Sequence, residues 1–125
     1  MTNIQQALGI QSIVARLLLR GTRDGKTNDI IHKLCDDKGS LLILIKTMKG
    51  ILCGAFCSIS WKGSGDWTVD KKAFLYSLKL KKIYKQLNDN YNLYFKPNYG
   101  FWIGYSGNIG VHNGKLTSYC NSDPF

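Results

Sequence analysis

Four cysteines and two histidines are the residues of this 125-residue chain whose types most readily support chemistry. A structural zinc site needs close ligand pairs, such as two cysteines on a tight turn. Cys53 and Cys57 instead lie in an apolar stretch that is expected to be a strand, which separates them by roughly 13 Å. His32 and Cys35 share one face of an expected helix, but no second ligand pair accompanies them. The sequence therefore predicts no metal site and no cofactor.

Nucleophilic catalysis requires a cysteine or serine beside a positioned histidine. His32 flanks the apolar stripe of a short expected helix, and His112 lies two residues before the glycine of an expected turn. Both are candidates only by default, so the sequence predicts a protein that is not an enzyme and has no catalytic residues. The alternative is a redox-active or antioxidant protein that uses a reactive thiol. Cys120 is the least constrained cysteine and is the candidate for that role.

The other thiols are expected to be free and unreactive. Disulfides form in oxidising compartments, and the N-terminus lacks the early basic region and cleavage site of a signal peptide, so a cytoplasmic location is predicted. Cys53 and Cys57 belong to an apolar strand face and are expected to be buried. Cys35 lies at the end of a helix beside Asp36 and Asp37, whose charges raise its pKa.

The formal charge is +9, from 17 basic and 8 acidic residues. Such a charge suits nucleic acid or an acidic protein surface. No recognition helix, RNA-recognition signature or zinc finger accompanies it, so we expect a protein partner and no nucleic acid. The basic residues are scattered except in KLKKIYK, residues 79–85, which is expected to be an exposed edge or loop. Its lysines are candidate partner-binding residues: Lys79, Lys81, Lys82 and Lys85.

Three further residues are candidates for partner binding. Arg23 and Asp24 lie in an expected turn, where a charged pair can meet a partner. In the alternative interpretation, Asp24 caps local backbone amides and Arg23 makes a structural hydrogen bond. Trp102, like Trp67, lies in an expected glycine-rich loop, where an exposed ring can mark an interface.

The most apolar stretch of the chain, residues 41–61, decides between a membrane segment and a soluble core. A spanning helix needs about 20 nearly uninterrupted apolar residues, whereas Lys46 and Lys49 fall close to the middle of this stretch. We therefore expect no transmembrane segment but a hairpin, with a turn over residues 47–50 in which Gly50 has a positive φ. One face of its second strand is expected to be buried, namely Ile51, Cys53, Ala55, Cys57 and Ile59.

Other elements follow from hydrophobic spacing. Residues 1–19 have helix-like spacing, and a short amphipathic helix is expected over residues 28–35 with Thr27 as its N-cap. The alternating segment AFLYSLKL, residues 73–80, is expected to be one half-buried strand with Phe74, Tyr76, Leu78 and Leu80 on the same face. Residues 91–95 repeat the alternation with Tyr91, Leu93 and Phe95 inward, and Asn113-Gly114 predicts another hairpin turn. About six strands in a mainly antiparallel α+β domain are expected.

The order and spacing of these features closely resemble the TLDc domain, which occurs in the oxidation-resistance proteins. The resemblance covers residues 17–121 most strongly, within a single expected domain over residues 1–125. It rests on the following pieces: Arg23-Asp24-Gly25, His32 with Cys35-Asp36, Lys38-Gly39, Leu42 through Lys46, Gly54 before Ser58 and Trp61, Ala73-Phe74-Leu75 with Ser77-Leu78, and Tyr99-Gly100.

The resemblance implies a fold and a function. The implied fold is α+β and mainly β, with two antiparallel sheets packed as a sandwich and short flanking helices. The implied function is a non-enzymatic interaction domain that binds the vacuolar-type proton-pumping ATPase (V-ATPase) and contributes to oxidative-stress resistance. We expect a monomer.

Three departures from the TLDc pattern accompany the resemblance. Trp102, Tyr105 and Asn108 stand among the glycines that usually follow the Tyr-Gly step, and Gly54-Ala55 replaces a common Gly-Gly. The family also continues past its YCN-type segment into a last strand, whereas this sequence stops at Phe125. A truncated or divergent copy with an exposed sheet edge is therefore expected, and a copy that has lost its partner is the remaining alternative.

Overall fold

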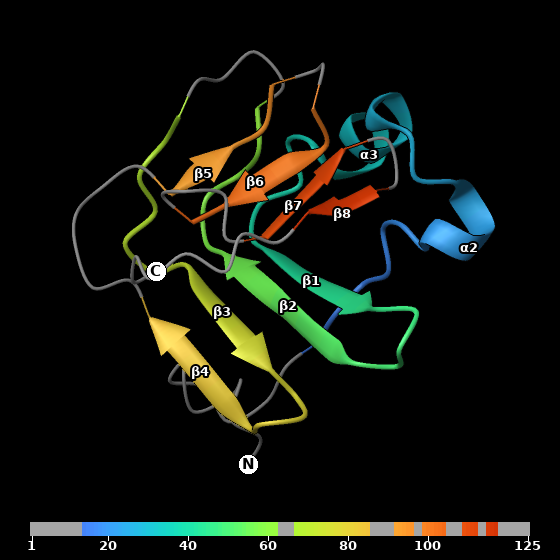
Figure 1. Ribbon diagram of the computed structural model, residues 1–125. Coiled ribbons are helices and arrows are strands. Elements are labelled where there is room, and N and C mark those ends of the chain that lie inside the picture. The colour runs from blue at the N-terminus through green and yellow to red at the C-terminus, as the bar shows by residue number, and fades with distance from the viewer. Residues whose placement is uncertain are drawn as a thin grey trace.

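The computed structural model describes residues 14–62, 67–85, 92–96, 99–104, 109–112 and 115–117. These residues form two short helices and eight strands, and the strands make two four-stranded antiparallel sheets. The sheets pack against each other, with the helices beside them (Figure 1). The expected α+β, mainly β sandwich is therefore confirmed.

The first sheet, called sheet A, contains β1 to β4 in sequence order, because each strand pairs antiparallel with the next. The strands are β1 (Leu41–Lys46), β2 (Leu52–Cys57), β3 (Phe74–Ser77) and β4 (Lys82–Lys85). The β1–β2 hairpin is the one expected from the sequence. Gly50 has a φ of 81° in its turn, and its amide donates to the Thr47 carbonyl over 2.9 Å.

The second sheet, called sheet B, contains β5 to β8, again in sequence order. The strands are β5 (Leu93–Tyr94), β6 (Phe101–Ile103), β7 (Ile109–His112) and β8 (Lys115–Thr117). His112 pairs with Lys115, so β7 and β8 form the hairpin that Asn113-Gly114 predicted. The two turn residues themselves lie outside the described residues.

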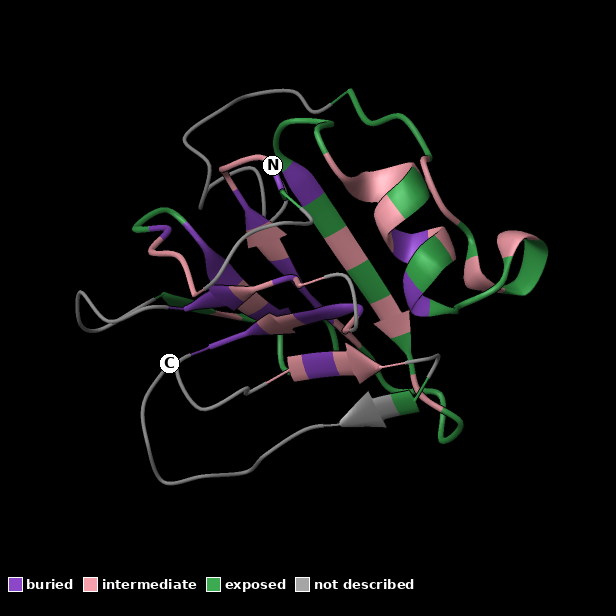
Figure 2. Ribbon diagram, turned by 90° about the horizontal axis from the view of Figure 1, so that it is seen from above, coloured by how far each residue is buried: buried purple, intermediate pink, exposed green. Residues whose placement is uncertain are grey.

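The core lies between the facing sides of the two sheets. Figure 2 shows buried residues gathered there, while the outward turns of the helices and the hairpin loops are exposed. Trp61, just after β2, is 1% exposed. It stacks on Phe95 at a centroid distance of 5.7 Å and contacts the tilted ring of Phe101 at 5.0 Å. The buried core cluster comprises Ile31, Leu41, Ala55, Cys57, Trp61, Ala73, Leu93, Phe95, Phe101 and Ile103.

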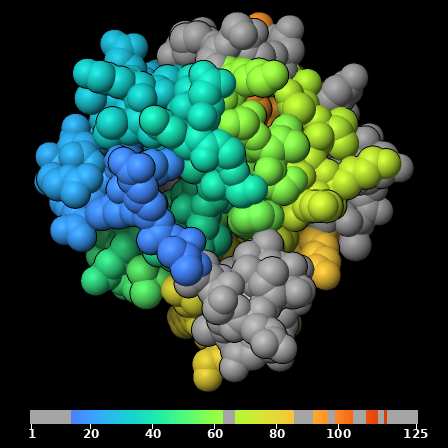
Figure 3. Space-filling model, turned by 180° about the vertical axis from the view of Figure 1, so that it is seen from behind, coloured from blue at the N-terminus to red at the C-terminus, as the bar shows by residue number. Residues whose placement is uncertain are grey.

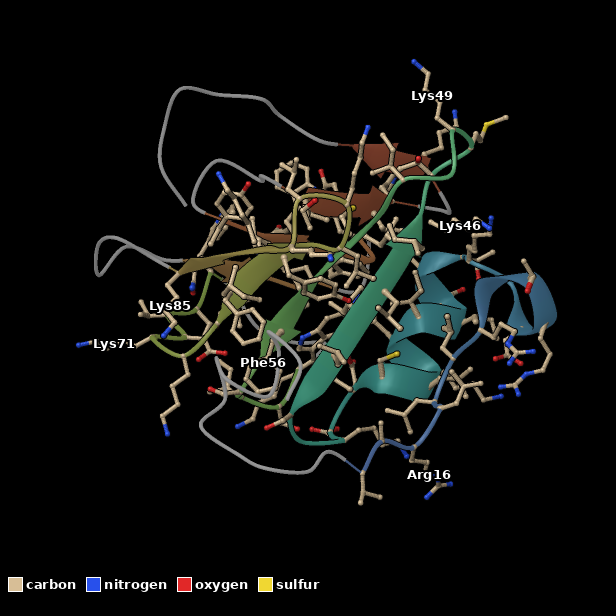
Figure 4. All side chains as sticks on the ribbon, turned by 90° about the horizontal axis from the view of Figure 1, so that it is seen from below. Arg16, Lys46, Lys49, Phe56, Lys71 and Lys85 are labelled. Atoms are coloured by element: carbon tan, nitrogen blue, oxygen red, sulfur yellow. The ribbon has the colours of Figure 1, made fainter. Side chains whose placement is uncertain are left out.

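Sheet A also buries apolar residues on its other face. Phe74 and Tyr76 alternate with Leu75, which packs on the core, so they belong to the opposite face of β3. They are nevertheless only 2% and 3% exposed, and Phe56 stacks on Phe74 at 5.2 Å. Figure 4 shows Phe56 on this face of the sheet.

The prediction of a single strand over residues 73–80 was wrong. The strand ends at Ser77, and the chain turns back to form β4 as an additional strand. The described residues contain eight strands in all, compared with the expected six or so. The Leu80 amide donates to Ser77 Oγ over 3.2 Å, and Lys81 has a φ of 51° in this turn. Because they lie in the turn, Leu78 and Leu80 are exposed, unlike Phe74 and Tyr76. Ile51 is likewise exposed and Cys53 only half-buried, although Ala55 and Cys57 are buried as expected.

The helices lie beside the sandwich. α3 (Asn28–Cys35) is the expected amphipathic helix, and Thr27 Oγ1 caps it by accepting from the Ile30 amide over 3.3 Å. α2 (Gly21–Asp24) is a single turn. Residues 14–20 are not helical and lie against the two helices (Figure 3), while the rest of the expected N-terminal helix lies outside the described residues.

A buried polar network ties the two sheets together. The carboxylate of Asp70, which is 2% exposed, accepts hydrogen bonds from the amide and hydroxyl of Ser58, each over 2.6 Å. The Asn92 side chain pairs with the Asp70 backbone through two bonds of 2.8 Å. Ser58 follows β2 and Asn92 precedes β5, so Asp70 connects the end of one sheet to the start of the other.

Candidate partner-binding surface

Arg23 and Asp24 form a local ion pair. Arg23 Nε and Asp24 Oδ1 are 2.7 Å apart, and the Arg20 amide donates to Asp24 Oδ2 over 2.8 Å. The hydrogen bond from Arg23, followed by that from the Arg20 backbone, lowers the pKa of Asp24 to about 2. These contacts agree with the structural interpretation, in which Asp24 accepts from a local amide and Arg23 orients it. The pair lies in α2 and not in an open turn.

The four candidate lysines follow the outer edge of sheet A. Lys79 and Lys81 lie in the β3–β4 turn, and Lys82 and Lys85 lie on β4, the last strand of the sheet. All four are exposed, which confirms the expected edge or loop. Lys82 pairs with Ser77, next to the turn, whereas Lys85 pairs with Phe74 at the opposite end of the strand. The lysines therefore form a line along the edge and not a compact patch.

Trp102 lies at the centre of an aromatic cluster on sheet B. It is part of β6 and not of a loop, so the sequence-based placement was wrong. Its neighbours Phe101 and Ile103 are buried in the core, so Trp102 belongs to the opposite face, where it pairs with Tyr94. We call this set of half-buried rings the aromatic cluster, and its members are Trp67, Tyr94, Tyr99, Trp102 and His112.

The rings of the aromatic cluster lie around Trp102. Trp102 lies 5.5 Å from Tyr99, 6.1 Å from Tyr94 and 6.4 Å from Trp67, measured between ring centroids. Its indole Nε1 is buried and has no hydrogen-bond acceptor among the described residues. Lys96 Nζ lies 5.9 Å from the Tyr94 ring centroid and adds a cation at the border. The cluster thus combines half-buried aromatic rings with a lysine at its border.

The candidate residues do not form one site. Figure 1 shows α2 beside the sandwich, β4 at the far edge of sheet A, and β6 within sheet B. Arg23 and Asp24, the four lysines, and Trp102 consequently mark three separate surfaces. Among the described residues, the surface around Trp102 gathers ring side chains from several segments of the chain.

The described cysteines are poor nucleophiles. Burial raises the pKa of the Cys57 thiol to about 12. Burial first, and the Asp36 carboxylate second, raise the pKa of Cys35 to about 11. Burial also raises the pKa of Cys53. Cys120 lies outside the described residues, within which no group of three or more histidine, cysteine or acidic side chains is placed to hold a metal ion.

Comparison with known proteins supplies the family. The family model described as the TLDc domain matches residues 3–123. The chain belongs to the TLDc family. One relative is the MTOR-associated protein MEAK7 of Xenopus laevis, which is 29% identical over 105 residues. The match covers 69% of this chain and 22% of MEAK7, so this TLDc chain corresponds to about a fifth of that relative.

His32, part of the TLDc resemblance, connects α3 to sheet B. Its Nδ1 faces the Asp36 carboxylate at 2.9 Å, and its Nε2 faces the carbonyl oxygens of Lys96 at 2.9 Å and Tyr99 at 2.5 Å. Both ring nitrogens thus face oxygen atoms of the protein, one on α3's side and two on the side of sheet B. His32 therefore has a structural role, because its ring links the end of α3 to the segment that precedes β6.

Gly100 allows close packing of β6 against β7 and α3 in the same part of the TLDc domain. A Cβ at this position would overlap the Val111 carbonyl and would lie 3.2 Å from Ile31 Cδ1. The Tyr99-Gly100 step therefore lets β6 approach β7 and α3 closely. The Tyr99 ring lies tilted against His112, with 5.0 Å between the ring centroids.

Sequence reasoning missed most of the aromatic cluster of this TLDc domain. Trp67 and Trp102 were both considered as interface residues, but Tyr94, Tyr99 and His112 were not. The available signal was alternation, because buried Leu93 and Phe95 flank Tyr94 as Phe101 and Ile103 flank Trp102.

Among the described residues, no helix is both long and apolar enough to cross a bilayer.

Proposed function

We propose that this TLDc domain is a non-enzymatic, monomeric, cytoplasmic interaction module that docks on the V-ATPase and contributes to oxidative-stress resistance. The observation that carries the proposal is the aromatic cluster around Trp102. Tyrosine and tryptophan are enriched among the residues that dominate binding energies at protein interfaces. Five rings from four separate segments meet on the face of sheet B that is turned away from the core.

Charge complements this surface. The net charge of +9 favours an acidic partner, and no acidic residue occurs between Lys71 and Lys85. Exposed charges mainly speed the encounter and orient it, while the contacts at the centre set the dissociation rate. We call the four exposed lysines on the outer edge of sheet A, Lys79, Lys81, Lys82 and Lys85, the lysine edge. In this proposal the lysine edge guides the approach of the partner, and the aromatic cluster forms the central contact.

The name of the relative suggests a second protein partner. MEAK7 is described as associated with MTOR. An MTOR-containing assembly is therefore the other protein target that we propose to test with the same surface. Both targets need a surface that binds proteins, and neither needs catalysis.

A pull-down from native lysate tests the proposal, with the purified chain as bait and bound proteins identified by mass spectrometry at two salt concentrations. We expect V-ATPase subunits at low salt and fewer at high salt. Trp102→Ala should abolish their recovery, whereas Tyr84→Ala, which removes an exposed ring from β4, should leave it intact. A folded chain that recovers no V-ATPase subunit contradicts the pump assignment.

A thiol-based activity has less support. The raised pKa values of Cys35, Cys53 and Cys57 oppose formation of the thiolate, which is the reactive species. A fast-reacting thiol at Cys120 in the native protein would favour the redox alternative.

A further inference from the structure

Two turns project side by side from one end of sheet A. The β1–β2 turn follows Lys46, which pairs with Leu52, and the β3–β4 turn follows Ser77, which pairs with Cys53. The Leu78 amide donates to the Leu52 carbonyl over 3.1 Å, which joins the two turns directly. We call residues 46–52 and 78–81 the hairpin end.

The hairpin end exposes large apolar side chains. Met48 is fully exposed at the tip of the first turn, and Leu80 is 58% exposed in the second. Leu44, on the strand leading to the first turn, is 65% exposed. Ile51, Leu52 and Leu78 are exposed as well. Met48, Leu78 and Leu80 lie in the two turns, and the other three residues lie on or beside the strands that the first turn connects.

The same turns are strongly basic. Lys46, Lys49, Lys79 and Lys81 are all exposed, and Figure 4 shows Lys46 and Lys49 at this end of the sheet, away from Lys71 and Lys85. The sequence contains no aspartate or glutamate from residue 41 to 62 or from residue 71 to 85. Protruding apolar tips are thus surrounded by positive charge without any nearby acidic residue in either hairpin.

We propose that the hairpin end binds the surface of a bilayer containing anionic phospholipids. Met48 and Leu80 enter the boundary between headgroups and acyl chains, and the lysines contact the headgroups while their stems cover the apolar tips. Basic residues at an anionic membrane surface strengthen binding additively, and the effect is screened by salt. A bilayer also adapts to separate protruding side chains, which a rigid protein surface accepts only through matching pockets.

The inference goes beyond the protein-binding role and uses a surface other than the aromatic cluster, although Lys79 and Lys81 belong to both the hairpin end and the lysine edge. The aromatic cluster belongs to sheet B, whereas the hairpin end belongs to sheet A. The two proposals therefore succeed or fail separately, because lipid binding is measured with purified chain and without any protein partner.

Vesicle flotation with the full chain tests the lipid proposal. We compare phosphatidylcholine vesicles with and without phosphatidylserine, at low and high salt. The chain should float only with the phosphatidylserine vesicles and should be released by salt. Equal binding to both compositions, or no binding to either at low salt, overturns the proposal.

Two pairs of variants test whether the hairpin end is responsible. Met48→Ser with Leu80→Ser should weaken vesicle partitioning about tenfold or more, because two apolar anchors are lost. Val14→Ser with Leu17→Ser, which also removes two exposed apolar side chains, should not weaken it. Lys49→Glu with Lys79→Glu should weaken partitioning roughly 30-fold or more. Lys33→Glu with Lys38→Glu changes the net charge equally and should have a much smaller effect.

Thermal melting of each variant confirms folding, which these exposed positions should not disturb. If the hairpin-end variants partition like their controls, the proposal is wrong. If the chain dimerises without lipid and Met48→Ser with Leu80→Ser dissociates the dimer, the surface is a self-association site and the lipid proposal is wrong. If the same variant loses only a protein from the pull-down, the hairpin end binds a protein instead.

Discussion

Tyr76 lies directly across from Gly54, and its hydroxyl passes over the glycine to donate a hydrogen bond to the Ile43 carbonyl. A Cβ at residue 54 would overlap both the Ile43 carbonyl and the Tyr76 side chain. The glycine thus lets a tyrosine on β3 reach across β2 to β1. Burial at this position raises the pKa of the Tyr76 hydroxyl, which therefore stays protonated and able to donate.

Gly54→Ala should destabilise the domain by about 1–3 kcal/mol or more, because the added methyl group forces strands apart in a packed sheet. Urea denaturation monitored by tryptophan fluorescence measures the change. Leu44→Ala, at the exposed residue that pairs with Gly54, is the control and should change stability little. A Gly54→Ala protein as stable as this control would show that the close approach is not needed.

His32→Ala should destabilise the domain by about 2–3 kcal/mol, because it leaves the Asp36 carboxylate and the Tyr99 carbonyl without the His32 ring. The Lys96 carbonyl still accepts from the Tyr99 amide. Lys33→Ala, on the exposed side of the same helix, serves as the matched control. Denaturation of His32→Ala, Asp36→Asn and the double variant should yield a coupling energy clearly different from zero. Simple additivity would mean that the two side chains act independently.

The buried thiols should make the free energy of unfolding fall as the pH rises above 9. The pKa of Cys35 is raised from 9.0 to about 11 in the folded state, so its contribution to stability is complete below pH 9 and declines as the pH rises toward 11. Cys35→Ala should reduce this decline, as measured by thermal melts across the range. Site-resolved alkylation at pH 9 should be slow at Cys35 and Cys57 in the native protein and fast after denaturation. Fast native alkylation would contradict the burial of these thiols.

The lysine edge and the aromatic cluster should affect partner binding differently. Lys82→Glu with Lys85→Glu should weaken docking and flatten its salt dependence, because screened long-range attraction is removed. Trp102→Ala should lower affinity about tenfold or more and leave the salt dependence unchanged. Titration of an isolated partner at several salt concentrations separates the two effects. If affinity and salt dependence both survive the lysine changes, the edge has no role in docking.

Sequence alone predicted the features that depend on neighbours along the chain. Thr27 caps α3, Gly50 turns the β1–β2 hairpin, and Leu93 with Phe95 point inward, all as expected. Each follows from a local rule, since caps, turns and alternation are decided within a few residues. The TLDc family could also be recognised from motif order. The exposed lysine edge followed from its composition.

Tertiary structure decided which surfaces are covered and which residues meet. Alternation placed Phe74, Tyr76, Leu78 and Leu80 together, but the turn after Ser77 buries the first two and exposes the others. His32 meets carbonyl oxygens 64 and 67 residues away, and the aromatic cluster joins residues from 67 to 112. Such contacts depend on how the sheets pack and where strands end, which the alternation of one segment does not encode. The proposed binding surfaces could therefore be identified only in the folded structure, whereas most of the helices and strands that carry them could be predicted from the sequence.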